Sequence, residues 1–109
     1  MANIGLAWVN PAPLAKPEDV INFARKCEAM AVDSMWTIDR IAYDNLEPLT
    51  LLAAAAGATK RIRLGTSVLL GNLRHPSHLA KIVATLDFIS NGRVTLGLGF
   101  GSRESDYKA

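Results

Sequence analysis

Short apolar segments alternate along the chain with longer segments whose apolar residues recur at helical spacing. This alternation predicts four β-strands, at residues 4–9, 34–38, 62–70 and 94–100, connected by three helices. The strands start at intervals of about 30 residues, which is the length of one strand–helix unit. Because helical connections join parallel neighbours through right-handed crossovers, the pattern predicts a parallel α/β fold.

Each predicted helix begins at a proline, the residue that favours the first helical position. The first helix starts at Pro17, where Glu18 and Asp19 suit the positive end of the helix dipole. The second starts at Pro48 and ends near Gly57.

The third helix begins at residues 75–77 and ends at the Asn-Gly pair 91–92. Apolar residues at helical spacing mark the faces by which helices pack on a sheet. The expected core faces are Val20, Phe23, Ala24, Cys27 and Met30 on the first helix and Leu79, Ile82, Val83, Leu86 and Ile89 on the third.

The last residues, 102–109, have the pattern of the first turn or two of a fourth helix. A finished domain rarely ends at such a point, and no linker divides the chain. We therefore expect residues 1–109 to be the amino-terminal portion of a (β/α)8 TIM barrel, truncated after the fourth strand. A complete small α/β binding domain of the flavodoxin type is the alternative. Strand order distinguishes them: 1-2-3-4 in a barrel and 2-1-3-4 in a doubly wound sheet.

The composition is that of an ordinary globular protein, with 50% hydrophobic and 20% charged residues. A net charge of +2 is too small to indicate nucleic acid or a membrane surface as a partner. No apolar stretch approaches the roughly 18–20 residues that span a bilayer. Residues 1–5 run into a strand pattern without the features of a signal peptide. We therefore expect a cytoplasmic location.

Cysteine and histidine indicate neither a disulfide nor a metal site. Cys27 is the only cysteine, and its place on an apolar helix face predicts a buried, unreactive thiol. His75 and His78 stand at a helix start without a third ligand nearby, so we expect no metal. Trp8 and Trp36 belong to predicted strands and are expected to pack there. No nucleophile set is visible, so catalytic residues stay unassigned.

The fourth strand carries the most informative pattern. Side chains along a strand alternate between its faces, so one face holds large residues and the other holds Thr95, Gly97, Gly99 and Gly101. Glycine weakens a strand, and three on one face need a reason. One reason is a flat, bulky molecule at the carboxyl end of the strand, where barrel active sites lie. The other is close backbone packing. A dinucleotide fingerprint is disfavoured because Ser102 replaces its third glycine.

Several segments, in order and at matching spacing, together resemble the bacterial luciferase-like family. They are DSMWT at 33–37, EPLTLL at 47–52, RIRLGTSVLL at 61–70, RHP at 74–76, LAK at 79–81, ATLD at 84–87, GR at 92–93 and LGLG at 96–99. Each motif is weak alone, but the set covers nearly the whole chain. The family contains flavin-dependent monooxygenases and oxidoreductases that use the deazaflavin coenzyme F-420, the methylenetetrahydromethanopterin reductases among them.

The resemblance implies an oxidoreductase that acts on a small-molecule substrate, with reduced FMN for oxygen activation or with coenzyme F-420 for hydride transfer. It implies a cofactor ring in the barrel mouth, over the carboxyl ends of the strands, where the protein holds it and shapes its electronics. We expect copies of the chain to associate as a homo-oligomer. A non-catalytic remnant is the alternative, because barrels commonly bind phosphate in later loops.

On this resemblance, seven residues are expected to bind the cofactor: Asp39, Thr66, Ser67, Val68, Gly97, Gly99 and Gly101. Asp39 stands where the family often has an acidic residue followed by histidine. Here Arg40 follows, so an acid–base role is not carried over. The alternative for Asp39 is an ion pair with Arg40 or a turn cap.

Ser67 and Val68 match a pair that, in the deazaflavin branch of the family, forms a bulge with a non-proline cis peptide and supports the ring. The resemblance therefore implies a bulge or a cis peptide at or beside these residues, and it favours the deazaflavin branch. An ordinary β-branched strand is the alternative. Residues 102–104 resemble the family's loop after the fourth strand.

Overall fold

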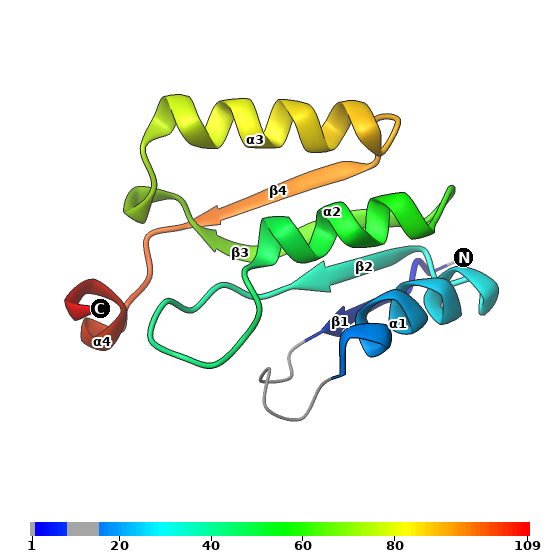
Figure 1. The fold of residues 1–109 in the computed structure, drawn as a ribbon, viewed down its shortest axis with the longest axis horizontal. Coiled ribbons are helices and arrows are strands. Elements are labelled where there is room, and N and C mark those ends of the chain that lie inside the picture. The colour runs from blue at the N-terminus through cyan, green and yellow to red at the C-terminus, as the bar shows by residue number, and fades with distance from the viewer. Residues whose placement is uncertain (1, 9–15) are drawn as a thin grey trace.

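The computed structural model describes residues 2–8 and 16–109, which form one four-stranded parallel sheet and its helices (Figure 1). The strands are β1 (Gly5–Trp8), β2 (Ser34–Thr37), β3 (Arg63–Leu70) and β4 (Val94–Gly99). The helices are α1 (Pro17–Ala29), α2 (Pro48–Ala58), α3 (Pro76–Ile89) and the short α4 (Glu104–Lys108), with a 3-10 turn η2 (Gly71–Leu73) before α3. All neighbouring strands pair in parallel, in the order β1-β2-β3-β4. This order confirms the predicted topology and excludes the doubly wound alternative.

The predicted boundaries are close to those observed. The helices α1, α2 and α3 all start at the predicted prolines, and α4 confirms the expected start of a fourth helix. The strand predicted at 4–9 is Gly5–Trp8, and position 9 lies outside the described residues. After α3, Asn91 and Gly92 have φ angles of 58° and 74°, the left-handed conformation that ends a helix.

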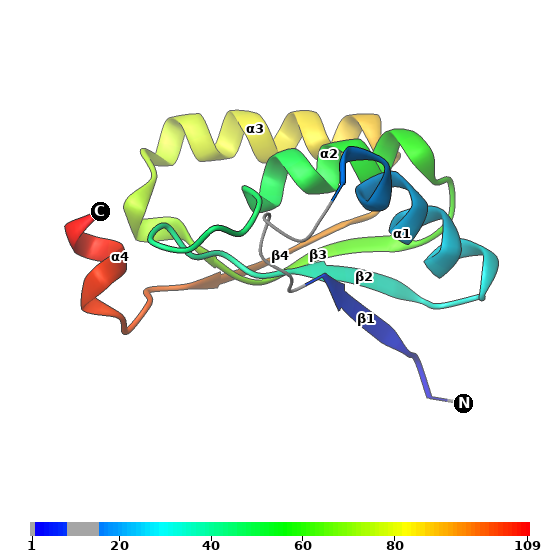
Figure 2. The ribbon, with the colours of Figure 1, turned by 60° about the horizontal axis from the view of Figure 1, so that its bottom comes forward.

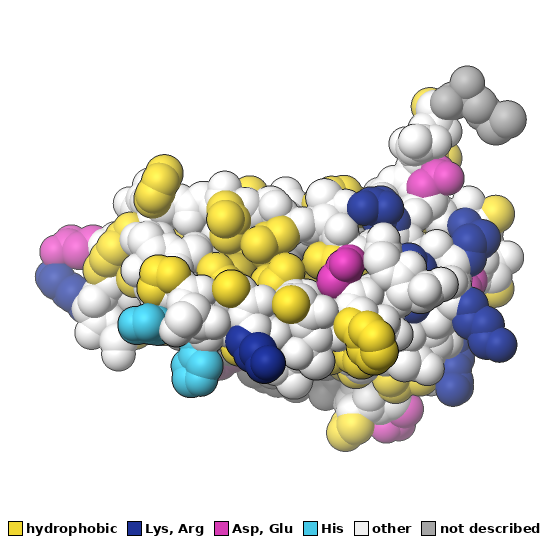
Figure 3. All heavy atoms as spheres, turned by 90° about the horizontal axis from the view of Figure 1, so that it is seen from above, with side chains coloured by type: hydrophobic (Ala, Val, Ile, Leu, Met, Phe, Trp, Pro, Cys, Tyr) yellow, Lys and Arg dark blue, Asp and Glu magenta, His cyan; other side chains and the backbone are white. Residues whose placement is uncertain are grey.

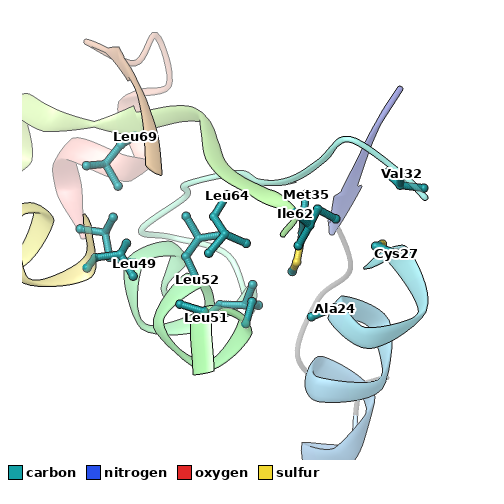
Figure 4. Close-up of a cluster of buried hydrophobic side chains, with 13 residues drawn as sticks. Ala24, Cys27, Val32, Met35, Leu49, Leu51, Leu52, Ile62, Leu64 and Leu69 are labelled. Carbon is teal, nitrogen blue, oxygen red and sulfur yellow. The ribbon is translucent and has the colours of Figure 1, made fainter. Parts of the chain in front are cut away.

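The first three helices cover one face of the sheet, and no helix of the described residues covers the other face (Figure 2). The core lies between the helices and the sheet (Figure 4), where Met35, Leu52 and Leu64 are fully buried. Burying a side chain of this size contributes about 1.5–3 kcal/mol. Cys27 is buried as predicted, and burial raises the pKa of its thiol, which keeps it in the unreactive protonated form.

Three residues predicted to lie in the core are exposed. Ile82 and Ile89 of α3 are 46% and 51% exposed, because they line a groove between α2 and α3 that the two helices do not close. Met30 is 68% exposed, because α1 ends one residue earlier, at Ala29. The prediction for Leu86, in contrast, is confirmed by its burial.

A second hollow, of 590 Å³, lies between α3 and the edge strand β4. Seen from the α3 side, apolar side chains gather along this flank (Figure 3). The large-residue face of β4 packs on the core at Val94 and Leu96 only, whereas Leu98 and Phe100 are exposed. The core contact of this face therefore ends at Leu96, and Phe100 lies beyond β4.

Arg93, in the turn between α3 and β4, holds the end of α2. Its guanidinium donates to the carbonyls of Ala56, Thr59 and Ile62 at 3.1, 3.0 and 2.9 Å and to the Thr59 hydroxyl at 2.8 Å. The last carbonyls of a helix have no partner within the helix. Arg93 therefore caps α2 from a position more than thirty residues further along the chain.

Candidate functional site

On the helix-free face of the sheet, one large, flat side chain lies between two glycines. Trp36 of β2 lies between Gly5 of β1 and Gly65 of β3. A methyl group on Gly5 would come within 2.6 Å of Trp36 Nε1, and one on Gly65 would collide with the indole ring. The Nε1–H donates to Ser34 Oγ at 2.7 Å. The indole therefore lies across three strands, and both of its neighbours need to be glycine.

The strand β3 contains a bulge near its carboxyl end. Thr66 pairs with Leu96 and Leu69 pairs with Leu98, so three steps along β3 correspond to two along β4. The peptide bond between residues 67 and 68 is cis. The Thr66 hydroxyl donates to the carbonyl of Gly97 at 2.8 Å and accepts from its N–H at 3.0 Å. The expected bulge or cis peptide is thus confirmed, and the ordinary strand is excluded.

The bulge directs Val68 onto the helix-free face, above the glycines of β4. A methyl group on Gly99 would come within 2.5 Å of Val68 Cγ2, and one on Gly97 would collide with the Thr66 carbonyl oxygen. Val68 itself is 42% exposed. Close packing against β3 therefore accounts for both glycines, and the surface presented to a ligand here is the side chain of Val68.

Gly101 follows β4 with a φ angle of 72° and sits beside a different side chain, that of Leu70. A methyl group on Gly101 would lie 2.9 Å from Leu70 Cδ2, and the positive φ would strain any other residue there.

Asp39 is buried at the carboxyl edge of the sheet. Its Oδ2 accepts from the N–H of Leu70 at 2.9 Å and forms an ion pair with Arg74, which also bonds Glu47 at 3.1 Å. Burial alone would lower the pKa of Arg74, but the Asp39 and Glu47 carboxylates outweigh it and raise that pKa. Asp39 is therefore paired with Arg74 rather than Arg40.

Arg40 instead bonds Asp106 of α4, at 2.7 Å. Its guanidinium also lies over the ring of Tyr43, 3.8 Å from the ring centroid. Neither Asp106 nor Arg74 was assigned a role from sequence. Asp106 lies 66 residues from Arg40, and Arg74 was visible only as part of a motif.

The remaining polar candidates form no further centre. His75 Nδ1 lies 2.8 Å from Ser77 Oγ, and His78 is exposed. Residues 2–8 and 16–109 contain no group of three or more acidic, histidine or cysteine side chains that could hold a metal ion. Over the same residues, no helix has both the length and the apolar character needed to cross a bilayer. Trp8 packs edge-on against Phe23, with ring centroids 5.1 Å apart, as expected of a packing residue.

Comparison with known proteins agrees with this architecture. Residues 5–109 match the family model of the luciferase-like monooxygenases, so the chain belongs to that family. It is 37% identical over 92 residues to the F420-dependent glucose-6-phosphate dehydrogenase of Amycolatopsis mediterranei, an alignment that covers 78% of this chain and 28% of the relative.

Two solved structures extend the likeness. The coenzyme F420-dependent tetrahydromethanopterin reductase of Methanopyrus kandleri superposes with a TM-score of 0.82 and 29% identity, over 97% of this chain and 29% of that one. The oxygenating constituent of 3,6-diketocamphane monooxygenase from Pseudomonas putida, solved in complex with FMN, gives a TM-score of 0.86 and 28% identity, over 97% and 32%. The four parallel strands and their helices match the start of these barrels. The chain thus spans about a third or less of the length of each relative.

Proposed function

We propose that this chain forms the first half of the barrel of an oxidoreductase that holds a flavin or deazaflavin ring against its helix-free face. The observation that carries the proposal is the bulge in β3, from which Val68 projects near the carboxyl edge of the sheet. A half-exposed apolar side chain above a floor of glycine backbone gives a flat ring a contact that a regular strand does not offer.

The residues around the bulge suit such a ring. Val68, packed over Gly99, would lie against it, and the exposed Ser67 offers a hydroxyl to its edge. Thr66 uses its hydroxyl on Gly97 and would therefore hold the bulge rather than the ring. The cofactor would supply the redox chemistry: hydride transfer for deazaflavin, or oxygen activation for reduced FMN.

Asp39 would act beside the ring rather than on it. One of its carboxylate oxygens is committed to the N–H of Leu70 and to Arg74, so Asp39 holds the end of β3 in place. Arg40 is paired with Asp106, and a guanidinium does not release its proton at neutral pH. We therefore assign no acid–base step to the positions after β2.

Deazaflavin is the cofactor that we favour. The relative from Amycolatopsis mediterranei carries this cofactor in its name and aligns over most of the chain, and the bulge at Ser67 and Val68 is the feature that the deazaflavin branch implies. FMN is the second candidate, supported by the likeness to the FMN complex from Pseudomonas putida. The proposal includes a small-molecule substrate, association between copies and a cytoplasmic location.

Titration of the full-length protein, meaning the family-length polypeptide to which we propose this chain belongs, tests the assignment. Trp36 lies on the proposed binding face, so its fluorescence should fall as oxidised deazaflavin or FMN binds. We expect micromolar binding of deazaflavin and weaker binding of FMN. Binding of neither would overturn the proposed function, whereas a preference for FMN would overturn only the choice of cofactor.

A further inference from the structure

The segment after β2 and the helix after β4 meet at the carboxyl edge of the sheet, although more than sixty residues separate them in the chain (Figure 1). The contact centres on Asp106, which is only 4% exposed. Its Oδ2 accepts from Arg40 Nε at 2.7 Å, and its Oδ1 accepts from the N–H groups of Ile41 and Ala42 at 2.9 and 3.0 Å. One buried carboxylate therefore holds three consecutive residues of the segment.

Hydrogen bonds of the neighbouring residue, Tyr107, also fix the position of α4. Tyr107, next to Asp106, donates its hydroxyl to the carbonyl of Phe100 and accepts from Asn72 Nδ2 at 2.7 Å. Asn72 belongs to η2, which directly follows β3. The helix α4 is thus bonded to the segment after β2, to η2 after β3 and to the residue that follows β4.

We propose that Asp106 is a positioning residue, which holds residues 40–42 against the carboxyl edge of the sheet and so shapes one wall of the cofactor site. The inference rests on the proposed function, because it concerns the same edge of the sheet. The residue before this segment is Asp39, whose carboxylate holds the end of β3 that carries Val68. A displacement of residues 40–42 would therefore move Asp39, and with it the end of β3 that carries the bulge.

The charges of the contact favour this arrangement. Hydrogen bonds to an ionised carboxylate are stronger than those between neutral groups. The N–H of Ala42, together with the Arg40 guanidinium and the N–H of Ile41, lowers the pKa of Asp106 against the opposing effect of burial. Asp106 is therefore ionised at neutral pH, and all three donors face a full negative charge.

Amide hydrogen exchange at Ile41 and Ala42 in the full-length protein, measured without cofactor, tests whether Asp106 restrains residues 40–42. In Asp106→Asn the side chain loses its charge and one of its two acceptor oxygens. We expect exchange at both amides to be about tenfold faster or more, from the strength of hydrogen bonds to charged groups. The matched control is Glu104→Gln on the same helix, where the same change removes only a surface pair with Lys108. Equal exchange in Asp106→Asn and wild type would overturn the inference.

The dissociation constant of the cofactor, measured in the same variants, tests the positioning role. We expect Asp106→Asn to bind about tenfold more weakly or worse, at a temperature where its melting curve shows that it is folded, and Glu104→Gln to bind as wild type does. Faster exchange with unchanged cofactor binding would overturn the positioning role.

Arg40→Lys separates the guanidinium from the two backbone donors. It retains the positive charge and leaves both backbone hydrogen bonds to Asp106, so we expect a smaller rise in exchange than in Asp106→Asn. An equal or larger rise in Arg40→Lys would overturn the assignment to Asp106 and would show that the Arg40 guanidinium restrains the segment. If the wild-type protein binds neither cofactor, the proposed function and the positioning role both fall, and the exchange rates still decide whether Asp106 holds the segment.

Discussion

Gly97 and Gly99 of β4 lie directly beside the bulge of β3, and neither position leaves room for a side chain. At Gly97 the obstacle to a side chain is the Thr66 carbonyl oxygen, which belongs to the backbone, whereas at Gly99 it is the end of the Val68 side chain. A side chain can rotate away from a new methyl group, but a backbone carbonyl within a paired strand moves only if the pairing changes. The two positions should therefore tolerate alanine differently.

We predict that Gly97→Ala lowers the free energy of unfolding by about 1–3 kcal/mol, the usual cost of overpacking, and that Gly99→Ala lowers it less. Gly57→Ala is the matched control. Gly57 lies in α2 with no neighbour within 4 Å of a new methyl group, so this change should be neutral or stabilising by about 0.5–1 kcal/mol. Urea unfolding of the three variants of the full-length protein measures the differences. A Gly97→Ala variant as stable as wild type would contradict the packing described here.

Sequence reasoning identified the residues of the bulge but not what surrounds them. Ser67 and Val68 were found through the resemblance to the family, which rests on short motifs that can be read along the chain. The Asp39–Arg74 pair joins residues 35 positions apart, and no periodicity indicates which of several arginines a carboxylate will meet. An ion pair with the adjacent Arg40 was the alternative for Asp39, but Arg40 bonds Asp106 instead.

At the scale of elements, Glu28 connects the end of α1 to the start of β3. Its carboxylate accepts from the N–H groups of Lys60, Arg61 and Ile62, at 2.5 to 3.0 Å. Burial acts to raise the pKa of Glu28, but these backbone N–H donors and the charge of Arg61 outweigh it and lower that pKa. The ionised carboxylate therefore stabilises the junction, and protonation weakens it.

This lowered pKa predicts a pH dependence of stability. A carboxylate with a lowered folded-state pKa contributes its full stability above the unfolded-state value, about 4.3 for Glu. The contribution is lost as the pH falls through the lower folded-state value. The difference in unfolding free energy between wild type and Glu28→Gln should thus be constant from about pH 7 to pH 5 and shrink below about pH 4. Denaturant titrations of both proteins at each pH measure it, and a difference that grows on acidification would contradict the assignment.

Element order and boundaries were predictable because they depend on local signals. Proline at each helix start, alternation in the strands and the Asn-Gly pair after α3 all act within a few residues. The burial of α3 was less predictable. Its apolar spacing is helical, but how far Ile82 and Ile89 are covered depends on the distance to α2, which the sequence does not state. The Arg93 cap on α2 was missed for the same reason.

Considered as a whole molecule, the described residues form a sheet with two open edges, β1 and β4. A closed barrel has no open edge, because its first and last strands pair. An edge strand presents unpaired backbone groups, and here exposed Leu6 and Leu98 lie on the two edge strands. Both features favour pairing with another polypeptide segment.

We predict that residues 1–109 produced alone self-associate and bind neither cofactor at micromolar concentration, since the opposite wall of the site would be missing. Static light scattering gives the molar mass, and thermal unfolding reports cooperativity. A monodisperse, cooperatively melting monomer that binds FMN or deazaflavin would contradict the proposal that the chain is half of a barrel.

We propose above all that a flavin or deazaflavin ring lies on the helix-free face of the sheet, against Val68. The most direct test follows the valine methyl resonances of the full-length protein by NMR during titration with oxidised deazaflavin and with FMN. The ring current of a bound cofactor should shift both Val68 methyl resonances, with saturation at the concentration at which the fluorescence saturates. The methyl resonances of Val83, in the hollow on the opposite side of the sheet, should stay in place. Saturable cofactor binding that leaves Val68 unshifted would contradict the account.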